Sequence, residues 1–190
     1  MHKDCSWPKG DPLMLKYHDE EWGKPIFDDK KLFEFLTLES AQAGLSWQIV
    51  LRKREGYRKA FTNFDPPAVA RYGTRELAKL LKNPNIIRNR LKIEATINNA
   101  KRFIEIQKEF GTFSKYMWSF VGSKPLDGKR RSLDDIPEYT KEAEAFSRDL
   151  KKRGFKFLGP TVVYAHMQAV GMTNDHILSC FRYKQVKMLK

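Results

Sequence analysis

The chain has 190 residues and a formal net charge of +13, and 41% of its residues are hydrophobic and 13% aromatic. This length fits a single domain over residues 1–190, and the apolar content is enough for a packed core, which excludes a disordered polycation. Two cysteines exclude a disulfide scaffold, and no apolar run approaches the roughly 20 residues of a membrane-spanning helix.

Helix signals dominate the first half of the chain. Asp28 or Asp29 can cap a helix through residues 31–39, and Ser46 can cap the next one. Asp65 followed by a proline is a further helix-start signal. The clearest helix lies near residues 90–109, where four apolar side chains recur at intervals of four, three and four: Ile93, Ile97, Ala100 and Ile104.

A long connection interrupts the helices of the second half. Apolar side chains near residues 113–121 predict a short helix, whereas residues 122–140 contain several turn formers. Helices resume near 141–153 and 161–170, and Gly171 is a stop signal. Alternating strand patterns are scarce, so we predict an all-α domain of roughly eight to ten short helices, without repeats or linkers.

Charge is unevenly distributed along the chain. Residues 1–48 hold nine acids against six bases, whereas residues 49–190 hold thirty bases against fourteen acids. A basic surface of this size is typical of proteins that bind a phosphate backbone, although a solvated basic surface without a partner has the same composition. The acidic segment ahead of a basic body indicates that one part binds a cation or polarised group while the other binds phosphates.

Four candidate metal ligands lie at the two ends of the chain. Cys5 and His18 are near the N-terminus, and His176 and Cys180 are four residues apart near the C-terminus, a spacing that places both on one helical face. Two thiolates and two imidazoles can form a closed tetrahedral zinc site, which would be structural and would join the termini. The spacing is not that of a zinc finger, so two buried cysteines and two unrelated histidines remain an alternative.

Three of the four tryptophans fall in the first 47 residues, around Glu39 on a mostly apolar predicted helix. Aromatic faces attract cations and a carboxylate accepts hydrogen bonds, so this segment can form a pocket for a cationic planar ligand. Core aromatics with a surface glutamate are the alternative. Gly44 and Leu45 predict a turn with an exposed apolar tip, the kind of side chain that wedges between base steps.

A short turn near residues 83–92 connects two predicted helices and is flanked by bases, among them Arg88, Arg90 and Lys92. A helix-hairpin-helix offers backbone amides and a helix N-terminus to a phosphate, which makes these residues candidate DNA contacts. An ordinary helix–helix connection is the alternative.

Short segments from Cys5 to Cys180 form a specific pattern: Cys5-Ser-Trp7, Asp11-Pro12, Tyr17-His18-Asp-Glu-Glu-Trp22-Gly23, Leu38-Glu39, Gln42-Ala-Gly-Leu-Ser-Trp47, Ile86-Ile-Arg-Asn-Arg-Leu-Lys92, Trp118-Ser-Phe-Val121, Lys151-Lys-Arg-Gly-Phe-Lys-Phe157 and Asn174-Asp-His176. With this pattern the chain resembles the 3-methyladenine DNA glycosylase I family over nearly its whole length. The resemblance implies an all-α helix-hairpin-helix glycosylase, with the hairpin part at about residues 65–125 and the two terminal segments forming a zinc-joined lobe.

The resemblance also assigns roles to the candidate residues. It implies one structural zinc ion on Cys5, His18, His176 and Cys180; a base pocket of Tyr17, Glu39 and Trp47 with Trp7 and Trp22 nearby; and an intercalating tip at Gly44 and Leu45. The hairpin turn departs from the family pattern, because Asn85 stands where glycine is usual; asparagine tolerates a left-handed backbone, so we expect the turn to survive. The tail after Cys180 matches no pattern that indicates a function.

The implied activity is removal of 3-methyladenine from duplex DNA by a monomer in the bacterial cytoplasm, in association with the nucleoid when it acts. The N-terminus has no hydrophobic signal region, in agreement with that location. Methylation makes the base cationic and a good leaving group, and no Asp occurs between Asp65 and Asp127 to serve as a hairpin-linked catalytic acid. No lysine stands out as a nucleophile either, so we expect a monofunctional hydrolase that leaves an abasic site.

Two other functions fit parts of the sequence. A metallohydrolase could use His18, Asp19 and Glu20 at a catalytic metal, but it would need an open coordination position. A non-catalytic DNA-binding module would share the basic surface and the hairpin and would release no base.

Overall fold

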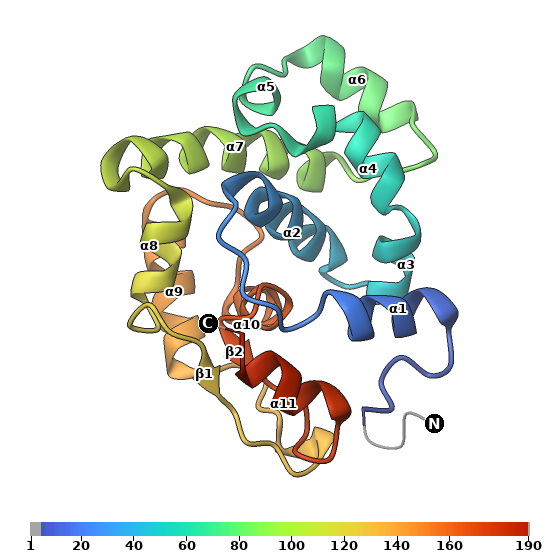
Figure 1. The fold of residues 1–190 in the computed structure, drawn as a ribbon. Helices are drawn as coiled ribbons and strands as arrows, with labels where there is room; N and C mark the ends of the chain where they lie inside the picture. The colour runs from blue at the N-terminus through green and yellow to red at the C-terminus, as the bar shows by residue number, and fades with distance from the viewer. Residues whose placement is uncertain (1–4, 190) are drawn as a thin grey trace.

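The computed structural model describes residues 5–189, and this part of the chain is mostly helical (Figure 1). Its first half contains α1 (Pro12–Glu20), α2 (Asp29–Gln42), α3 (Trp47–Arg52), α4 (Arg54–Ala60), α5 (Pro66–Ala70) and α6 (Thr74–Lys82). Its second half contains α7 (Arg90–Phe110), α8 (Phe113–Ser119), α9 (Lys141–Lys152), α10 (Pro160–Ala169) and α11 (Phe181–Lys187). Two 3-10 turns, η1 (Thr62–Phe64) and η2 (Leu133–Asp135), and a parallel pair of two-residue strands, β1 (Leu126–Asp127) and β2 (Thr173–Asn174), complete it.

The all-α prediction is confirmed, with eleven α-helices in the described residues. The additional helices have local causes: the tail after Cys180 forms α11, and the stretch after Ser46 divides into α3 and α4 at Lys53. Asp28, and not Asp29, caps α2, with its carboxylate accepting from the Lys31 amide at 2.8 Å. Gly171 ends the α10 segment with φ of +74°, and a side chain there would collide with the backbone of Lys24.

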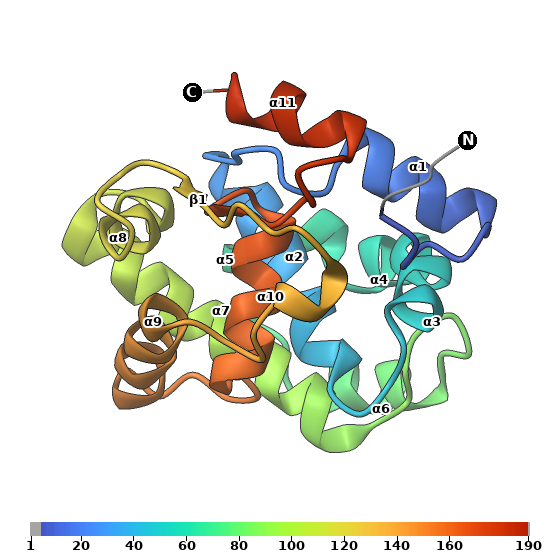
Figure 2. The same cartoon turned by 90° about the horizontal axis from the view of Figure 1, so that it is seen from below.

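Helix α2 lies at the centre of the molecule, and ten of its fourteen residues are buried. It packs against α3, α7, α8 and α10, and Figure 2 shows α2 and α10 enclosed by the other helices. The core is aromatic where α2, α7 and α8 meet: the Phe33 and Phe103 ring centroids are 5.3 Å apart, and those of Phe103 and Phe113 are 4.0 Å apart. This packing holds the last turn of α2, which carries Glu39, in a fixed position.

The turn between α6 and α7 is built by side-chain contacts. The Asn83 carboxamide oxygen accepts from the Asn85 amide at 2.9 Å, and Lys53 Nζ donates to the Pro84 carbonyl at 2.7 Å. Gly56 is required beneath it, since a Cβ there would lie 2.1 Å from the Asn85 carbonyl oxygen. The left-handed backbone considered for Asn85 is absent, because φ is not positive at this residue. The turn therefore persists without glycine because its conformation does not need one.

Candidate functional site

A cavity of about 410 Å³ lies between the N-terminal segment, α2 and α10. All five pocket residues predicted from the sequence line it: Trp7, Tyr17, Trp22, Glu39 and Trp47. Five further residues complete this aromatic pocket: Gln42, Leu133, Ile136, Ala165 and Gln168. Sequence reasoning missed these five, and four of them lie on distant elements with no local signal: Ala165 and Gln168 on α10, and Leu133 and Ile136 in the long connection after residue 122.

Glu39 is the only ionisable carboxyl among the residues lining the aromatic pocket. It lies in the last turns of α2 and is 4% exposed. Within residues 5–189 no hydrogen bond or ion pair is found for its carboxyl group. Burial raises its pKa to about 8, because nothing nearby compensates for the loss of water around the charged form. Burial, and then the charge of Glu39, also raise the pKa of Tyr17 well above its usual value.

Aromatic rings surround the pocket; Trp7 packs edge-on against Tyr17 and Trp22, and Tyr17 is tilted against Trp47. Ring centroids are 5.3 Å apart for Trp7 and Trp22, 6.3 Å for Trp7 and Tyr17, and 5.3 Å for Tyr17 and Trp47. The indole N–H groups of Trp7 and Trp47 are buried and have no hydrogen-bond partner in the described part of the chain. The pocket thus combines an uncompensated carboxyl group with aromatic walls, a combination that suits a planar cation.

The predicted tip, Gly44 and Leu45, follows α2 after its C-cap residue Ala43. Gly44 has φ of +76°, the Leu45 amide donates to the Gln42 carbonyl at 2.6 Å, and the Leu45 side chain is 38% exposed. A second hollow of about 320 Å³ is lined by the tip, by Glu39 and Gln42, and by the start of α10. The second hollow and the aromatic pocket therefore share three lining residues, Glu39, Gln42 and Ala165.

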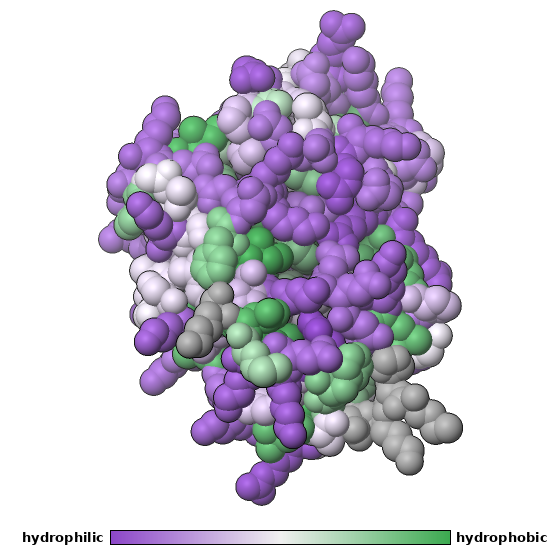
Figure 3. All heavy atoms as spheres, in the orientation of Figure 1, coloured by the Kyte–Doolittle hydropathy of each residue, from purple (hydrophilic) through white to green (hydrophobic). Residues whose placement is uncertain are grey.

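Lys92 contacts the end of α2. Its Nζ donates to the carbonyls of Ala41 at 2.8 Å and Ala43 at 2.6 Å, and partial burial lowers its pKa. These are carbonyls that a helix C-terminus leaves without partners. Arg88 and Arg90 are exposed on the same hairpin, where Arg90 pairs with Glu94 one helical turn away. Figure 3 shows hydrophilic side chains over much of the face around α4–α7.

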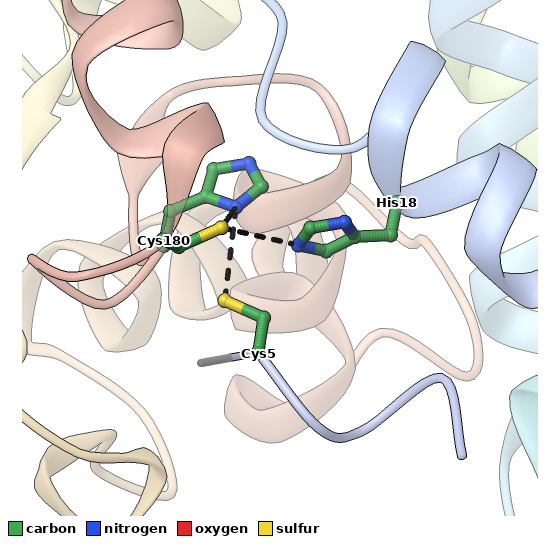
Figure 4. Close-up of side chains that lie close together, drawn as sticks. Cys5, His18 and Cys180 are labelled. Atoms are coloured by element: carbon green, nitrogen blue, oxygen red, sulfur yellow. Dashed lines mark hydrogen bonds between the residues drawn. The ribbon is translucent and has the colours of Figure 1, made fainter. Parts of the chain in front are cut away.

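The four predicted metal ligands converge. The donor atoms of Cys5, His18, His176 and Cys180 all lie within 4.8 Å of one another, and all four residues are buried. Cys180 Sγ is 3.7 Å from both His18 Nε2 and His176 Nδ1, and Cys5 Sγ is 4.0 Å from His176 Nδ1. Figure 4 shows the side chains pointing toward a common centre from the N-terminal segment, α1 and the start of α11. This four-donor cluster could hold a metal ion.

The remaining ring nitrogens of the two histidines have partners outside the cluster. His18 Nδ1 lies 2.7 Å from an Asp19 carboxylate oxygen, and His176 Nε2 lies 3.2 Å from the Trp22 carbonyl oxygen. Since these oxygens only accept, they fix the tautomers that leave His18 Nε2 and His176 Nδ1 without a proton. Hydrogen bonding with Cys5 lowers the pKa of Cys180, and hydrogen bonds with both histidines lower it further. Burial acts in the opposite direction but does not outweigh them.

Comparisons with known proteins agree with this geometry. The family model described as methyladenine glycosylase matches residues 7–183. The chain belongs to the methyladenine glycosylase family. The chain is 46% identical to DNA-3-methyladenine glycosylase 1 of Escherichia coli K12 over 179 residues, 94% of this chain and 96% of that protein. It is 44% identical to DNA-3-methyladenine glycosylase of Haemophilus influenzae over 176 residues, which are 93% of this chain and 95% of that protein.

Solved structures of the family share the fold. A crystal structure of 3-methyladenine DNA glycosylase I has a TM-score of 0.92 at 47% identity, covering 94% of this chain and 98% of that one. The Staphylococcus aureus enzyme, described in terms of 3-methyladenine recognition, has a TM-score of 0.92 at 40% identity, covering 95% and 96%. A further structure is a tyrosine-to-phenylalanine variant in complex with 3-methyladenine, with a TM-score of 0.91 at 40% identity, covering 94% and 96%. The resemblance inferred from the sequence is thus confirmed.

No helix in residues 5–189 combines the length and the apolar character needed to cross a bilayer.

Proposed function

We propose that this chain is a monofunctional DNA glycosylase that removes 3-methyladenine from alkylated duplex DNA and leaves an abasic site. The observation that supports this most strongly is Glu39, a buried carboxyl group in a pocket walled by tryptophans, with no partner in the described part of the chain. A base inside a duplex cannot reach such a pocket, so the nucleotide must leave the stack. Relatives with the same fold are named as 3-methyladenine DNA glycosylases.

The reaction needs little acid–base chemistry. The glycosidic bond breaks with its electron pair passing to the cationic base, which departs neutral, and water adds to the sugar carbon and loses a proton. Glu39 accepts from the amino edge of the base and stabilises its positive charge, Trp47 stacks on the ring, and Tyr17 contributes a second contact. A neutral adenine provides no charge for these groups to stabilise, so it binds less tightly.

The protonation state of Glu39 depends on whether a cationic base is bound. With a pKa of about 8, much of the Glu39 population is protonated in the empty site at neutral pH. A cationic base favours the carboxylate form, so it lowers this pKa as it binds. The positively charged base therefore acts as the ion-pair partner that the Glu39 carboxylate does not find among the described residues.

We infer that the tip enters the duplex and that the hairpin contacts the backbone. Leu45 on the Gly44 turn fills the space left by the flipped nucleotide. Arg88 and Arg90 are exposed and available for phosphates, whereas Lys92 already bonds the end of α2 and acts on DNA by holding the tip. Residues 1–190 act as one domain, as a monomer in the cytoplasm, with the hairpin part at about 65–125.

The four-donor cluster fits a structural zinc ion. Two cysteine sulfurs and two histidine nitrogens are a common zinc ligand set, and tetrahedral bonds of about 2.0 to 2.3 Å place such donors about 3.3 to 3.8 Å apart. Cys180 Sγ lies 3.7 Å from a nitrogen of each histidine, within this range. A site filled by four protein ligands has no position for a reacting water, so the ion would join the N- and C-terminal segments and take no part in base release.

One assay separates this proposal from a metallohydrolase and from a DNA-binding module. Methylated duplex DNA is incubated with the protein, without added metal, and the released bases are separated by chromatography. We expect free 3-methyladenine and an intact strand with an abasic site. DNA binding without base release would favour the module, and activity lost and restored with chelator and metal, while the fold persists, would favour the metallohydrolase.

A further inference from the structure

The Gln168 side chain lies in the aromatic pocket with one end of its amide already engaged. Gln168 is on α10, one turn after Ala165, and both residues line the pocket. Its Nε2 donates to a carboxylate oxygen of Asp175 at 2.9 Å. No hydrogen bond is found for its Oε1 among the described residues.

Asp175 is held so that it can only accept from Gln168. Its side chain is fully buried, and its other oxygen receives Nε–H of Arg130 at 3.0 Å in an ion pair. The Tyr164 hydroxyl donates to the same oxygen that Gln168 uses. Arg130 is in turn held by the Asp135 carbonyl at 3.1 Å. A carboxylate paired with arginine has no proton to donate, so Gln168 must direct its NH2 toward Asp175 and its oxygen away from it.

The backbone at Gly128 packs so closely against Asp175 that the hydrogen bonds between Asp175, Arg130 and Gln168 cannot rearrange. A Cβ on Gly128 would lie 2.2 Å from the Asp175 oxygen that Arg130 contacts. The Gly128 amide donates to the Asn174 carbonyl at 3.1 Å. Gly128 lies in the same long connection that contributes Leu133 and Ile136 to the aromatic pocket. The orientation of the Gln168 amide is therefore fixed before a ligand binds.

We propose that Gln168 is a specificity-determining residue whose Oε1 accepts a hydrogen bond from the amino group of the bound base. This inference rests on the proposed function, because it assumes that the aromatic pocket takes the methylated base. The exocyclic amine provides the N–H groups of 3-methyladenine, so a fixed acceptor matches it. A base with a carbonyl oxygen in that position would place two acceptors face to face.

Gln42 provides the contrast within the same pocket. It also lines the aromatic pocket, but its side-chain amide has no hydrogen-bond partner within residues 5–189. Gln42 can therefore rotate to offer either its oxygen or its NH2, and it cannot select between an amino group and a carbonyl. The two glutamines differ in whether a carboxylate holds one end of the side-chain amide.

Binding of free bases tests the proposal directly. Tryptophan fluorescence measures the Kd for 3-methyladenine and for its 6-oxo analogue, 3-methylhypoxanthine, in the wild-type protein, Gln168→Met and the matched control Gln42→Met. We expect Gln168→Met to weaken 3-methyladenine binding by about 5- to 30-fold, the effect of one lost hydrogen bond, and to reduce the preference for the amino base by a similar factor. Gln42→Met should leave that preference within about twofold of wild type.

The outcomes are distinguishable. If the wild-type protein does not bind 3-methyladenine, the proposed function is wrong and this inference is wrong with it. If the wild-type protein binds but Gln168→Met keeps the same preference for the amino base, only the role of Gln168 is overturned. Should that variant fail to fold, the side-chain carbonyl ¹³C resonance of Gln168 in the wild-type protein decides: we expect it to shift when 3-methyladenine is added, and no shift would contradict the proposal.

Discussion

The four-donor cluster and the aromatic pocket are neighbours, since Trp22 lines the pocket and its ring also packs against His176, yet they differ in how their buried polar atoms are partnered. In the cluster, each histidine has one nitrogen directed at the cysteines and the other bonded to an oxygen. In the pocket, Glu39 is buried and no partner for its carboxyl group is found among residues 5–189. The first arrangement stabilises the fold, whereas the second costs stability and is retained where a ligand supplies what is missing.

Two buried glutamates on α2 make the same contrast within one helix. Glu34 is 2% exposed and accepts from Arg54 at 2.6 Å and Arg58 at 2.9 Å. Burial raises the pKa of Glu34, but Arg54 and Lys31 together lower it by more, so that it lies below its usual value. Glu39 is about equally buried and its pKa is raised to about 8. Partners, and not burial alone, separate a structural glutamate from a functional one.

The largest effect is expected from breaking the four-donor cluster. Cys180→Ser should lower the Tm by about 6 to 12 °C, since the proposed zinc site would lose one ligand and leave three buried donors uncompensated. A chain of this length shifts by roughly 2 to 4 °C per kcal/mol. Calorimetry measures this, and base release per folded molecule should stay unchanged. Reversible loss of activity at an unaltered Tm would show instead that a metal acts in catalysis.

Substitution of Glu39 should raise the Tm, whereas Cys180→Ser should lower it. Its folded pKa of about 8 exceeds the unfolded value near 4.5, so the unfolded state loses its proton first and stability falls as pH rises from 4.5 to 8. Glu39→Gln should therefore raise the Tm by about 5 °C or more at pH 8.5 and change it little at pH 4. Glu34→Gln is the matched control and should destabilise at pH 8.5, because it leaves arginines without their partner. A lower Tm for Glu39→Gln at pH 8.5 would contradict the assignment.

Lys92→Met should loosen the tip without altering the pocket. We expect about a tenfold slower excision from duplex DNA, because the two carbonyls at the end of α2 lose a charged donor. Binding of free 3-methyladenine should remain within about twofold of wild type, since no base contact is removed. Equal losses in both measurements would place Lys92 in the pocket instead of at the tip.

The smallest effects are expected at the exposed arginines. Arg88→Ala and Arg90→Ala should each weaken duplex binding by a few fold and reduce the slope of log K against log salt by about one. Binding titrations at several salt concentrations measure this. An unchanged slope in both variants would remove the hairpin arginines from the DNA interface.

Local patterns predicted the helices, whereas the four candidate metal ligands came from the family resemblance; the helical turn expected for His176 and Cys180 is wrong, because these residues lie in the loop between β2 and α11. Apolar spacing and capping residues such as Asp28 act within one or two turns, so they are visible in the sequence. The tip was predicted for the same reason, because Gly44 directly follows the helix that ends at Gln42.

The rest of the site depends on contacts between distant segments. Gln168 enters the pocket because α10 packs against α2, and Asp175 orients it from beyond the end of that helix. Lys92 carried a signal for phosphate binding, but its ammonium group turns toward the end of α2, 49 residues earlier at Ala43. No local periodicity encodes such pairs, so sequence analysis alone could identify the pocket's aromatic walls but not its fixed acceptor.

Single-turnover excision by Glu39→Gln is the most direct test of the central claim that an uncompensated buried carboxyl group recognises the cationic base. The enzyme is held at saturating concentration on duplex DNA that contains 3-methyladenine, and free base is measured over time. We predict a rate at least about a hundredfold below wild type, as expected when a charged contact to the leaving group is removed, with duplex affinity unchanged. Full excision by this variant would contradict the account.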